Sequence, residues 1–392
     1  MQNKFPPNDL MSLLDVNLKF NLGESTSADM FLREILDEKV LSEIGDLKMS
    51  YGTSRGSEVL REAIGLKLNV PAQKILITNG SIAAIFMAIF CLCEKGDEVI
   101  TVTPNFPPTL DIIAAIGATR KTIALDFDND YQLMAPEIEK LLSALTKLII
   151  LVSPHNPSGK TIPESKVKEI FDLIKTKSPD AYLLVDETFR DAVYGENPAE
   201  KSFADYSDRI LTVASVSKAH GAPGLRTGWL TCHDDSLMEQ LTLAKMNTVL
   251  SGSPLDEFFA TVVLQKENEI LNYRKRLLKK AIGMVETWVS QNSEYVEWVR
   301  PDAGAFCCMR LREDVFSDAD VEGFYNRLPK NELQLAAGNW FQDSRRIFRL
   351  GFGFVPIEVL AQALEQLQNL LRQSHTQAVS GSSEFNIFST TP

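Results

Sequence analysis

The sequence has little of what zinc sites and disulfide frameworks require. Of its 392 residues, only four are histidine and five are cysteine. No pair of histidines has the spacing of a zinc site. An odd number of cysteines, several of them inside apolar runs, indicates buried, reduced thiols. We therefore expect no metal and no disulfide.

Long apolar runs and surplus positive charge are lacking as well. No apolar run reaches the roughly 18 residues that a membrane-spanning helix needs, and the start, MQNKFPPNDL, does not follow the plan of a signal peptide. Forty basic against 52 acidic side chains give a net charge of −12, which opposes binding to a phosphate backbone. The sequence predicts a soluble, cytoplasmic protein that binds neither membranes nor nucleic acid.

Short β-rich runs alternate with helical segments from Lys74 to about Cys232. The runs are KILITNG, DEVITVTP, TRKTIALDF, KLIILVSP, AYLLVDETF, RILTVASVSK and RTGWLTC. Such alternation is typical of βα units, and strands that are apolar on both faces favour a mostly parallel sheet covered by helices. The predicted fold class is therefore α/β.

The remainder of the chain predicts a second, smaller unit. Residues from Leu255 to about Gln291 predict one long helix, and an α+β region with a closing helix near Pro356–Leu371 follows. The last residues are polar and without pattern, and we expect them to be flexible. The predicted parts are residues 1–48 as the N-terminal segment of a small domain, 49–290 as a large domain, 291–372 as the C-terminal small domain, and 373–392 as a tail.

Five polar clusters stand at or near the carboxyl ends of predicted strands. They are NGS at 79–81, PNFP at 104–107, PHNPSG at 154–159, DETF at 186–189 and SVSK at 215–218. Ligands of α/β proteins bind at this edge of the sheet. One such cluster is ordinary for a strand-to-helix turn, but five in order indicate a binding site.

These clusters resemble those of the pyridoxal-phosphate enzymes of fold type I, the class I/II aminotransferase superfamily. The most diagnostic segment is SVSKAHGAPGLRTGW, residues 215–229, in which Thr227 replaces the usual small aliphatic residue. The resemblance runs from about Asn21 to Leu371. It implies a large domain that binds pyridoxal 5′-phosphate on a mostly parallel, seven-stranded sheet, a smaller α+β domain from both terminal segments, and a free amino acid as substrate.

The resemblance also implies which residues contact the cofactor ring. Lys218 would hold the cofactor as a Schiff base and move protons, and Asp186 would pair with the pyridine nitrogen. Asn156 would donate to the ring oxygen, and Phe106 would stack on the ring. The ordinary alternatives are a solvated lysine, a helix-capping aspartate and a core phenylalanine.

The cofactor phosphate would lie at the start of the helix after Gly80, where free N–H groups and the helix dipole favour anions. The resemblance adds three hydroxyls and one guanidinium as donors: Ser81, Ser215, Ser217 and Arg226. Tyr51 resembles the tyrosine that reaches the phosphate of a neighbouring subunit, which implies a homodimer.

Substrate contacts follow from the same resemblance. Arg349 would bind the substrate α-carboxylate, assisted by Asn156, and Gly23 would close over the substrate. Glu24 either pairs with a substrate guanidinium or is an ordinary turn glutamate. His155 and His220 have no required role in the family, and we interpret both as structural.

One departure from the family pattern concerns the chemistry. Many members carry a tyrosine three residues after the ring-nitrogen aspartate, and here that residue is Phe189. Loss of this donor, worth roughly 1.5–3 kcal/mol, should raise the pKa of the Schiff base and alter reprotonation. Together with the PHNPSG turn, Phe189 resembles the capreomycidine- and enduracididine-forming subgroup, whose members cyclise or oxidise arginine-derived amino acids.

The resemblance implies an external aldimine and deprotonation of the substrate Cα to a quinonoid. Our leading hypothesis is elimination or cyclisation of a substituted arginine-type amino acid, and the alternative is transfer of the amino group to a 2-oxo acid. A regulator or binding protein without turnover is the alternative from another class. The presence of the lysine, the aspartate and both arginines opposes it, and no DNA-binding segment is expected before residue 20.

Overall fold

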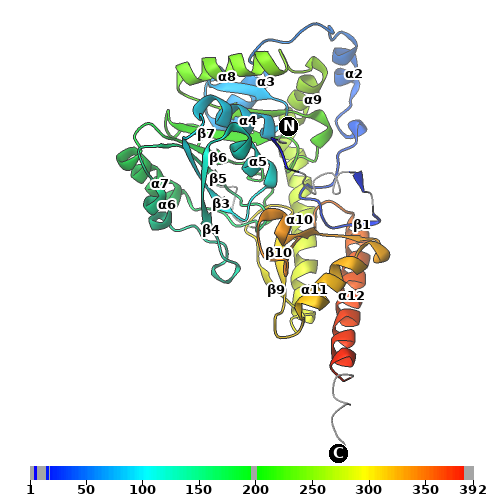
Figure 1. The fold of residues 1–392 in the computed structure, drawn as a ribbon. Coiled ribbons are helices and arrows are strands. Elements are labelled where there is room, and N and C mark those ends of the chain that lie inside the picture. The colour runs from blue at the N-terminus through cyan, green and yellow to red at the C-terminus, as the bar shows by residue number, and fades with distance from the viewer. Residues whose placement is uncertain (1–3, 7–14, 17, 196–200, 384–392) are drawn as a thin grey trace, which may run out of the picture.

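A seven-stranded sheet forms the middle of the larger part of the molecule (Figure 1). This computed structural model describes residues 4–6, 15–16, 18–195 and 201–383. In spatial order the strands are β2 (Ile75–Thr78), β8 (Gly228–Thr231), β7 (Ile210–Ser215), β6 (Tyr182–Asp186), β5 (Thr146–Val152), β3 (Glu98–Thr103) and β4 (Thr119–Ala124). β8 runs opposite to the other six strands of this sheet. The predicted α/β class with a mostly parallel sheet is confirmed.

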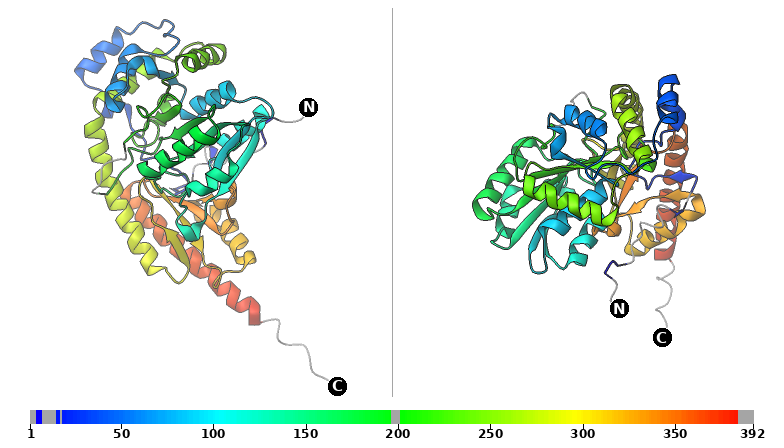
Figure 2. Two further views of the ribbon diagram at one scale, coloured as in Figure 1. Left: turned by 90° about the vertical axis from the view of Figure 1, so that its left-hand side faces the viewer. Right: turned by 90° about the horizontal axis from the view of Figure 1, so that it is seen from above.

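Helices cover both faces of this sheet (Figure 2). On β5, Leu148 and Ile150 belong to one hydrophobic core, which includes α4 (Ser81–Leu92), α5 (Pro107–Ile116) and α8 (Asp235–Thr248). The alternate residues Ile149 and Leu151 belong to another, with α6 (Ala135–Leu141) and α7 (Glu164–Lys177). Because successive side chains of a strand point to opposite faces, a strand buried on both sides is apolar throughout. At the β2 end, α3 (Glu58–Leu68) and α9 (Pro254–Gln265) pack together.

The single long helix predicted from Leu255 to Gln291 is two helices. The first, α9, ends at Gln265, and α10 (Glu267–Gln291) begins after Lys266. The Lys266 ammonium donates to the Ile35 carbonyl over 3.1 Å and pairs with Asp37 over 2.7 Å, which ties the break to the N-terminal segment. A contact between such distant parts of the chain has no signature in the local helical pattern.

A second sheet lies beside the lower half of α10 (Figure 1). It is antiparallel, in the order β12 (Ala336–Ala337), β13 (Ile347–Gly351), β10 (Phe306–Leu311), β9 (Val296–Val299). The helices α11 (Asp318–Arg327) and α12 (Ile357–Ser383) pack with α10 in its core. Near the N-terminus, β1 (Phe20–Asn21) pairs with β11 (Leu333–Gln334), so both terminal segments share one α+β unit. The predicted domain limits at 48/49 and 290/291 stay a prediction.

The C-terminal helix is longer than predicted. It continues to Ser383, beyond the predicted end near Leu371, and the flexible tail expected at 373–392 stays a prediction; residues 384–392 lie outside the described residues. One reason is Ser374, which is buried and accepts a hydrogen bond from Arg327 over 2.8 Å. No helix within the described ranges is long and apolar enough to cross a membrane.

The remaining elements are short. They are α2 (Glu38–Gly45) and the 3-10 turns Leu32–Glu34, Ala72–Lys74, Phe127–Asn129, Pro223–Leu225, Pro329–Asn331 and Gly338–Phe341. All five cysteines are free thiols, and all except Cys91 are buried.

Candidate active site

The topology gathers the predicted clusters at one edge of the seven-stranded sheet. Residues 79–80, 104–106 and 153–156 follow the ends of β2, β3 and β5, whereas Asp186 and Ser215 are the last residues of β6 and β7. Because β8 runs in the opposite direction, it begins at this same edge, and Arg226 lies just before its first residue, Gly228. Residues spread over 150 positions of sequence are thus brought to one edge.

Two glycines, Gly80 and Gly228, leave open space beside Arg226 at the start of α4, which we call the phosphate cradle. Gly80 is the N-cap of α4, at φ 78° and ψ 166°, and a Cβ there would lie 2.6 Å from Nη2 of Arg226. A Cβ on Gly228 would lie 2.6 Å from the backbone nitrogen of Ser81. Ser215 pairs with Gly228 across the β7–β8 ladder, which adds its hydroxyl nearby. A guanidinium against the free N–H groups of a helix start is an anion site, and it fits a phosphate.

Ser217 is the least direct member of this group. Its backbone N–H donates to Oγ of Ser215 over 3.3 Å, and its side chain is buried. Ser215 keeps its own hydroxyl proton available for an anion, since Oγ acts as the acceptor in that contact.

Lys218 follows the end of β7 by three residues. Its Nζ donates to Oγ of Ser25 over 3.0 Å and lies 5.7 Å from the ring centroid of Phe189. Burial lowers the pKa of Lys218 to about 8; Glu24 opposes this shift, while the positive charges of Arg349 and Arg226 add to it. Near neutral pH a useful share of the amine is unprotonated, as a nucleophile and a base require.

Asp186 ends β6 with its carboxylate held by the following turn. Its Oδ1 accepts from the backbone N–H of Thr188 over 2.9 Å. No helix begins directly after Asp186. Asp186 therefore does not cap a helix, which was the alternative interpretation of this residue. Burial raises the pKa of Asp186, against the opposing contacts of Thr188 and the charge of Lys218. A carboxylate with a raised pKa is a better acceptor for the proton of a ring nitrogen.

Arg349, on β13, connects the two parts of the molecule. Its Nη1 donates to Oδ1 of Asn156 over 2.8 Å, and its Nη2 to the Gly23 carbonyl over 2.5 Å. Its Nε is buried without a partner among the described residues. Burial lowers the pKa of Arg349 to about 10, so the guanidinium stays charged at neutral pH. With the Asn156 oxygen engaged, the amide NH2 remains to donate to a ring oxygen.

Sequence reasoning missed an aromatic enclosure around this guanidinium. The Arg349 guanidinium lies 5.0 Å from the Phe341 ring, 5.5 Å from Phe306 and 6.0 Å from Trp340. Trp340 also meets Phe106 edge to face, with ring centroids 6.0 Å apart. Phe306 lies on β10, whereas Trp340 and Phe341 lie on the 3-10 turn Gly338–Phe341, so no single sequence motif marks the enclosure.

Phe189 is buried and packs edge to face against Phe306, with centroids 4.9 Å apart. Its ring therefore forms part of the wall between the Lys218 amine and the aromatic residues around Arg349. Phe106, at the N-cap of α5, is partly buried and packs against Trp340.

Two of the predicted residues lie at the margin of the site. Glu24 is partly buried, and its charge acts on both Lys218 and Arg349. Tyr51 has 83% of its surface exposed. The next residue, Gly52, lies against Gly252: a Cβ added to Gly52 would lie 3.5 Å from the Gly252 carbonyl oxygen. Gly252 in turn lines a small pocket beside Arg226.

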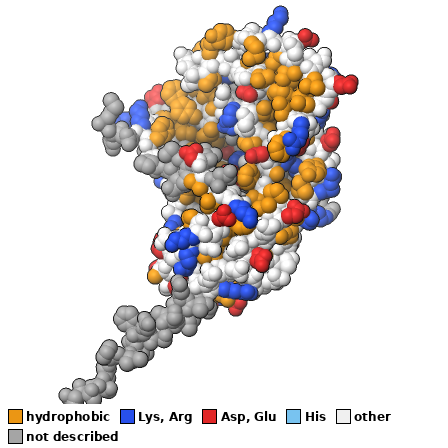
Figure 3. All heavy atoms as spheres, turned by 90° about the vertical axis from the view of Figure 1, so that its right-hand side faces the viewer, with side chains coloured by type: hydrophobic (Ala, Val, Ile, Leu, Met, Phe, Trp, Pro, Cys, Tyr) orange, Lys and Arg blue, Asp and Glu red, His pale blue; other side chains and the backbone are white. Residues whose placement is uncertain are grey.

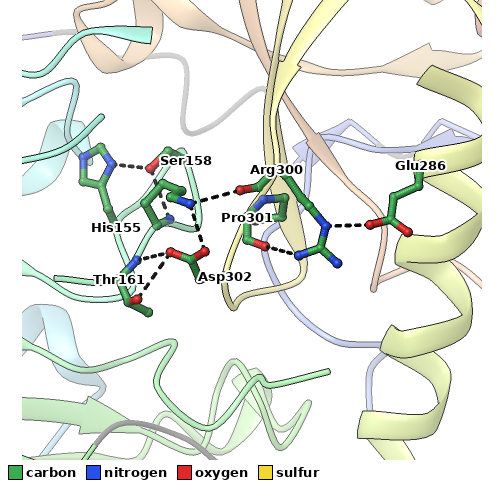
Figure 4. Close-up of polar contacts among 8 residues, drawn as sticks. His155, Ser158, Thr161, Glu286, Arg300, Pro301 and Asp302 are labelled. Atoms are coloured by element: carbon green, nitrogen blue, oxygen red, sulfur yellow. Dashed lines mark hydrogen bonds and ion pairs between the residues drawn. The ribbon is translucent and has the colours of Figure 1, made fainter. Parts of the chain in front are cut away.

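His155 holds the turn that carries Asn156. Its Nε2 donates to the Pro104 carbonyl over 2.9 Å, so its Nδ1 accepts from the Ser158 hydroxyl over 2.7 Å (Figure 4). Burial lowers the pKa of His155 to about 4, and the imidazole is therefore neutral. Thr161 bonds to Asp302 and fixes the same turn to the second sheet (Figure 4).

A cavity of about 540 Å³ lies beyond this turn. Its walls include His155, Thr161 and Asp302 but none of the residues predicted to bind the cofactor. This cavity is thus separate from the predicted chemistry, and we do not place the substrate in it.

His220 is buried beside a group of partly buried charged side chains. Ligand-type atoms of Asp191, His220 and Glu267 lie within 4.8 Å of one another. The Lys67 ammonium contacts both carboxylates, at 2.9 Å from Asp191, and supplies the positive charge between them. Nε2 of His220 lies 2.8 Å from Glu267. We interpret this group as an ion-pair cluster.

Comparison with known proteins gives one family and several relatives. The model of the family described as aminotransferase class I and II matches residues 18–367. A capreomycidine synthase of Streptomyces vinaceus is 28% identical over 312 residues, 79% of this chain and 78% of that protein. An arginine–pyruvate transaminase of Pseudomonas aeruginosa is 26% identical over 310 residues, 75% of each. The crystal structure of a PLP-dependent aminotransferase from Streptococcus suis superimposes with a TM-score of 0.86 at 23% identity, covering 95% of this chain and 99% of that one.

Proposed function

The chain belongs to the family of class I and II aminotransferases, and from that premise we propose that it eliminates or cyclises a substituted arginine-type amino acid. It is a pyridoxal 5′-phosphate-dependent enzyme. The observation that carries the substrate proposal is the carboxylate of Glu24, which lies close enough to influence the pKa of both Lys218 and Arg349.

The described residues fit the cofactor. Gly80, Ser81, Ser215 and Arg226 would hold its phosphate in the cradle at the start of α4. Asn156 would donate to the ring oxygen. When bound, pyridoxal phosphate supplies an electron-accepting ring that acidifies the Cα–H bond of an attached amino acid.

The protein's own groups then perform three tasks. Arg349 binds the substrate α-carboxylate with its charged fork, whose Nε has no partner among the described residues. Lys218, with a pKa of about 8, takes the proton from the substrate Cα and returns it. Asp186 would keep a proton on the ring nitrogen, because the negative charge of its carboxylate favours the protonated, positively charged ring. The aromatic enclosure excludes water from this reaction.

A second carboxyl, that of Asp29, supports the proposal that the substrate side chain is cationic. Partial desolvation raises the pKa of the exposed Asp29, the charge of Glu24 raises it further, and the charges of Arg274 and Lys218 lower it, so the two carboxyls lie near each other. A guanidinium forms bidentate pairs with carboxylates and would relieve their mutual repulsion. Phe189 favours elimination or ring closure, because the usual tyrosine donor to the cofactor is missing at that place.

Transamination is the second candidate. It is favoured by the family as a whole and by the likeness to an arginine–pyruvate transaminase. An arginine-type substrate serves both candidates, so Glu24 does not distinguish them, whereas the requirement for a 2-oxo acid does.

The test uses purified, cofactor-loaded protein with arginine and with arginine hydroxylated at its β or γ carbon, each with and without 2-oxoglutarate. We expect product from the hydroxylated substrate without any oxo acid. Turnover that depends strictly on the oxo acid would refute elimination and establish transamination. Lys218→Ala should abolish the absorbance of the lysine–cofactor linkage, and survival of that absorbance would overturn the assignment of the site.

Glu24→Gln tests the substrate class. We expect KM for the arginine-type substrate to rise at least about tenfold, the loss of roughly 1.4 kcal/mol, with little change for alanine. Glu43→Gln is the matched control, because Glu43 is exposed and pairs with Lys39 on α2. An equal rise for both amino acids would argue against a guanidinium partner.

We further propose a homodimer in which Tyr51 completes the neighbour's phosphate site. Exposed apolar side chains support it: Met49, Tyr51 and Leu66 are 79–88% exposed. Hydrophobic side chains gather over the upper half of one face (Figure 3). Mixing inactive Lys218→Ala with a weakly active Tyr51→Phe protein should restore activity, because one site of a mixed dimer is intact. Monomers in light scattering, or no recovery on mixing, would refute this.

A further inference from the structure

The segment from Gly23 to Ser27 runs between two cationic groups of the site. The carbonyl of Gly23 accepts from Arg349, and the hydroxyl of Ser25 accepts from the Lys218 ammonium over 3.0 Å. Two residues later, the backbone N–H of Ser27 donates to the Lys218 carbonyl over 3.2 Å. Lys218 is therefore contacted at its amine and at its main chain by serines two positions apart.

Both ends of this segment are fixed by backbone contacts. Upstream, the N–H of Gly351 donates to the Leu22 carbonyl over 2.7 Å. Downstream, the N–H of Met30 donates to the Gly221 carbonyl over 2.6 Å, and Arg274 donates to the Ala28 carbonyl over 2.5 Å. Ser25 itself is only 5% exposed. The contact between Ser25 and Lys218 is thus set by the packing of the segment.

We infer that Ser25 is a positioning residue, which holds the Lys218 amine in place in both of its protonation states. This role rests on the proposed function, because Lys218 must both release and take up a proton. The ionisable groups that act on Lys218 are Glu24, Asp29, Asp186, Arg226 and Arg349.

A hydroxyl suits this task better than a charged group. It accepts a hydrogen bond from an ammonium, and it turns to donate to the lone pair of a neutral amine. The carboxylates nearby are acceptors only, and the arginines are donors only, so each of them favours one protonation state. Ser25 keeps its contact while Lys218 changes state, which preserves the direction of the amine.

The hydrogen bond of Ser25 to the Lys218 ammonium is stronger than its hydrogen bond to the neutral amine, because charge-assisted hydrogen bonds are about twice as strong as neutral ones. Ser25 should therefore raise the pKa of Lys218 by about one unit above the value that burial alone would give. Removing the Ser25 hydroxyl should therefore lower the pKa of Lys218, even though the substitution removes no charge.

The first experiment measures the Lys218 amine without turnover. The full chain, freed of cofactor, is acetylated with acetic anhydride across a pH series, and modification of Lys218 is quantified by peptide mass spectrometry. We expect the midpoint for Ser25→Ala to lie about one pH unit below that of the wild type, and Ser25→Thr to restore it. Ser27→Ala is the matched control, because its hydroxyl is buried without a partner within the described residues.

The second experiment uses the cofactor-loaded protein and follows exchange of the substrate α-proton with deuterium by NMR. Ser25→Ala should slow the exchange about tenfold at saturating substrate, with KM unchanged. An unchanged or higher acetylation midpoint in Ser25→Ala, or an equal shift in Ser27→Ala, would overturn the inference. Failure of the proposed function appears differently: wild-type protein would then exchange no amino acid proton, or would turn over its substrate only with a 2-oxo acid, while the acetylation midpoints would still differ.

Discussion

The substitution Gly80→Ala tests the phosphate cradle most directly. Gly80 has φ 78° and ψ 166°, a region that is essentially restricted to glycine. The new methyl group would lie 2.6 Å from Nη2 of Arg226, well inside van der Waals contact. The guanidinium must therefore move, or the start of α4 must shift away from it.

The expected magnitude follows from these two effects. A charge-assisted hydrogen bond to phosphate is worth roughly 1.5–3 kcal/mol, so its loss should raise the cofactor Kd about 10- to 150-fold. Separately, the backbone strain should lower the free energy of unfolding of the cofactor-free protein by about 1–3 kcal/mol.

The assay is a spectroscopic titration of cofactor-free protein with pyridoxal phosphate, paired with urea unfolding. Gly224→Ala is the matched control, because it lies two residues before Arg226 and a Cβ there would meet nothing within 4 Å. It should bind the cofactor as the wild type does. An unchanged Kd in Gly80→Ala, or an equal rise in Gly224→Ala, would refute the placement of the phosphate beside Arg226.

Three further predictions concern the other groups of the site. Arg349→Lys replaces a planar fork by one ammonium, so steady-state kinetics should show KM for the amino acid raised at least about tenfold with the cofactor Kd unchanged; a normal KM would exclude Arg349 from carboxylate binding. Phe189→Tyr restores the family's usual donor and should lower the pKa of the lysine–cofactor linkage, read from absorbance against pH, by about one unit; an unchanged or higher pKa would contradict the role given to this position. Because burial lowers the pKa of Lys218 from 10.5 to about 8, the unfolded chain retains a proton in that interval that the folded protein has released. The free energy of unfolding of the cofactor-free protein should therefore rise with pH between about 8 and 10.5, and in Lys218→Met this contribution should disappear; identical pH dependence in both proteins would contradict the buried position of the amine.

The sequence by itself determined the class of the fold and the order of the predicted site along the chain. Strands that are buried on both faces must be apolar throughout, and the turns after them need glycine, asparagine, serine and proline. Both requirements are local, so the runs from KILITNG to RTGWLTC predicted the seven strands. The motif around Lys218 and Arg226 is also one continuous stretch of sequence, and it indicated the family.

Tertiary structure decided what depends on contacts between distant segments. The helix break at Lys266, the helical residues 373–383 and the rings of Phe306, Trp340 and Phe341 around Arg349 have no local pattern. Ser25 stands 193 residues before Lys218, and Gly23 stands 326 residues before Arg349. Such pairs meet because β1 joins β11 and because α10 contacts both α9 of the larger part and β9 of the second sheet. Local patterns record which residues are buried, whereas the packing of whole elements sets which buried residues touch.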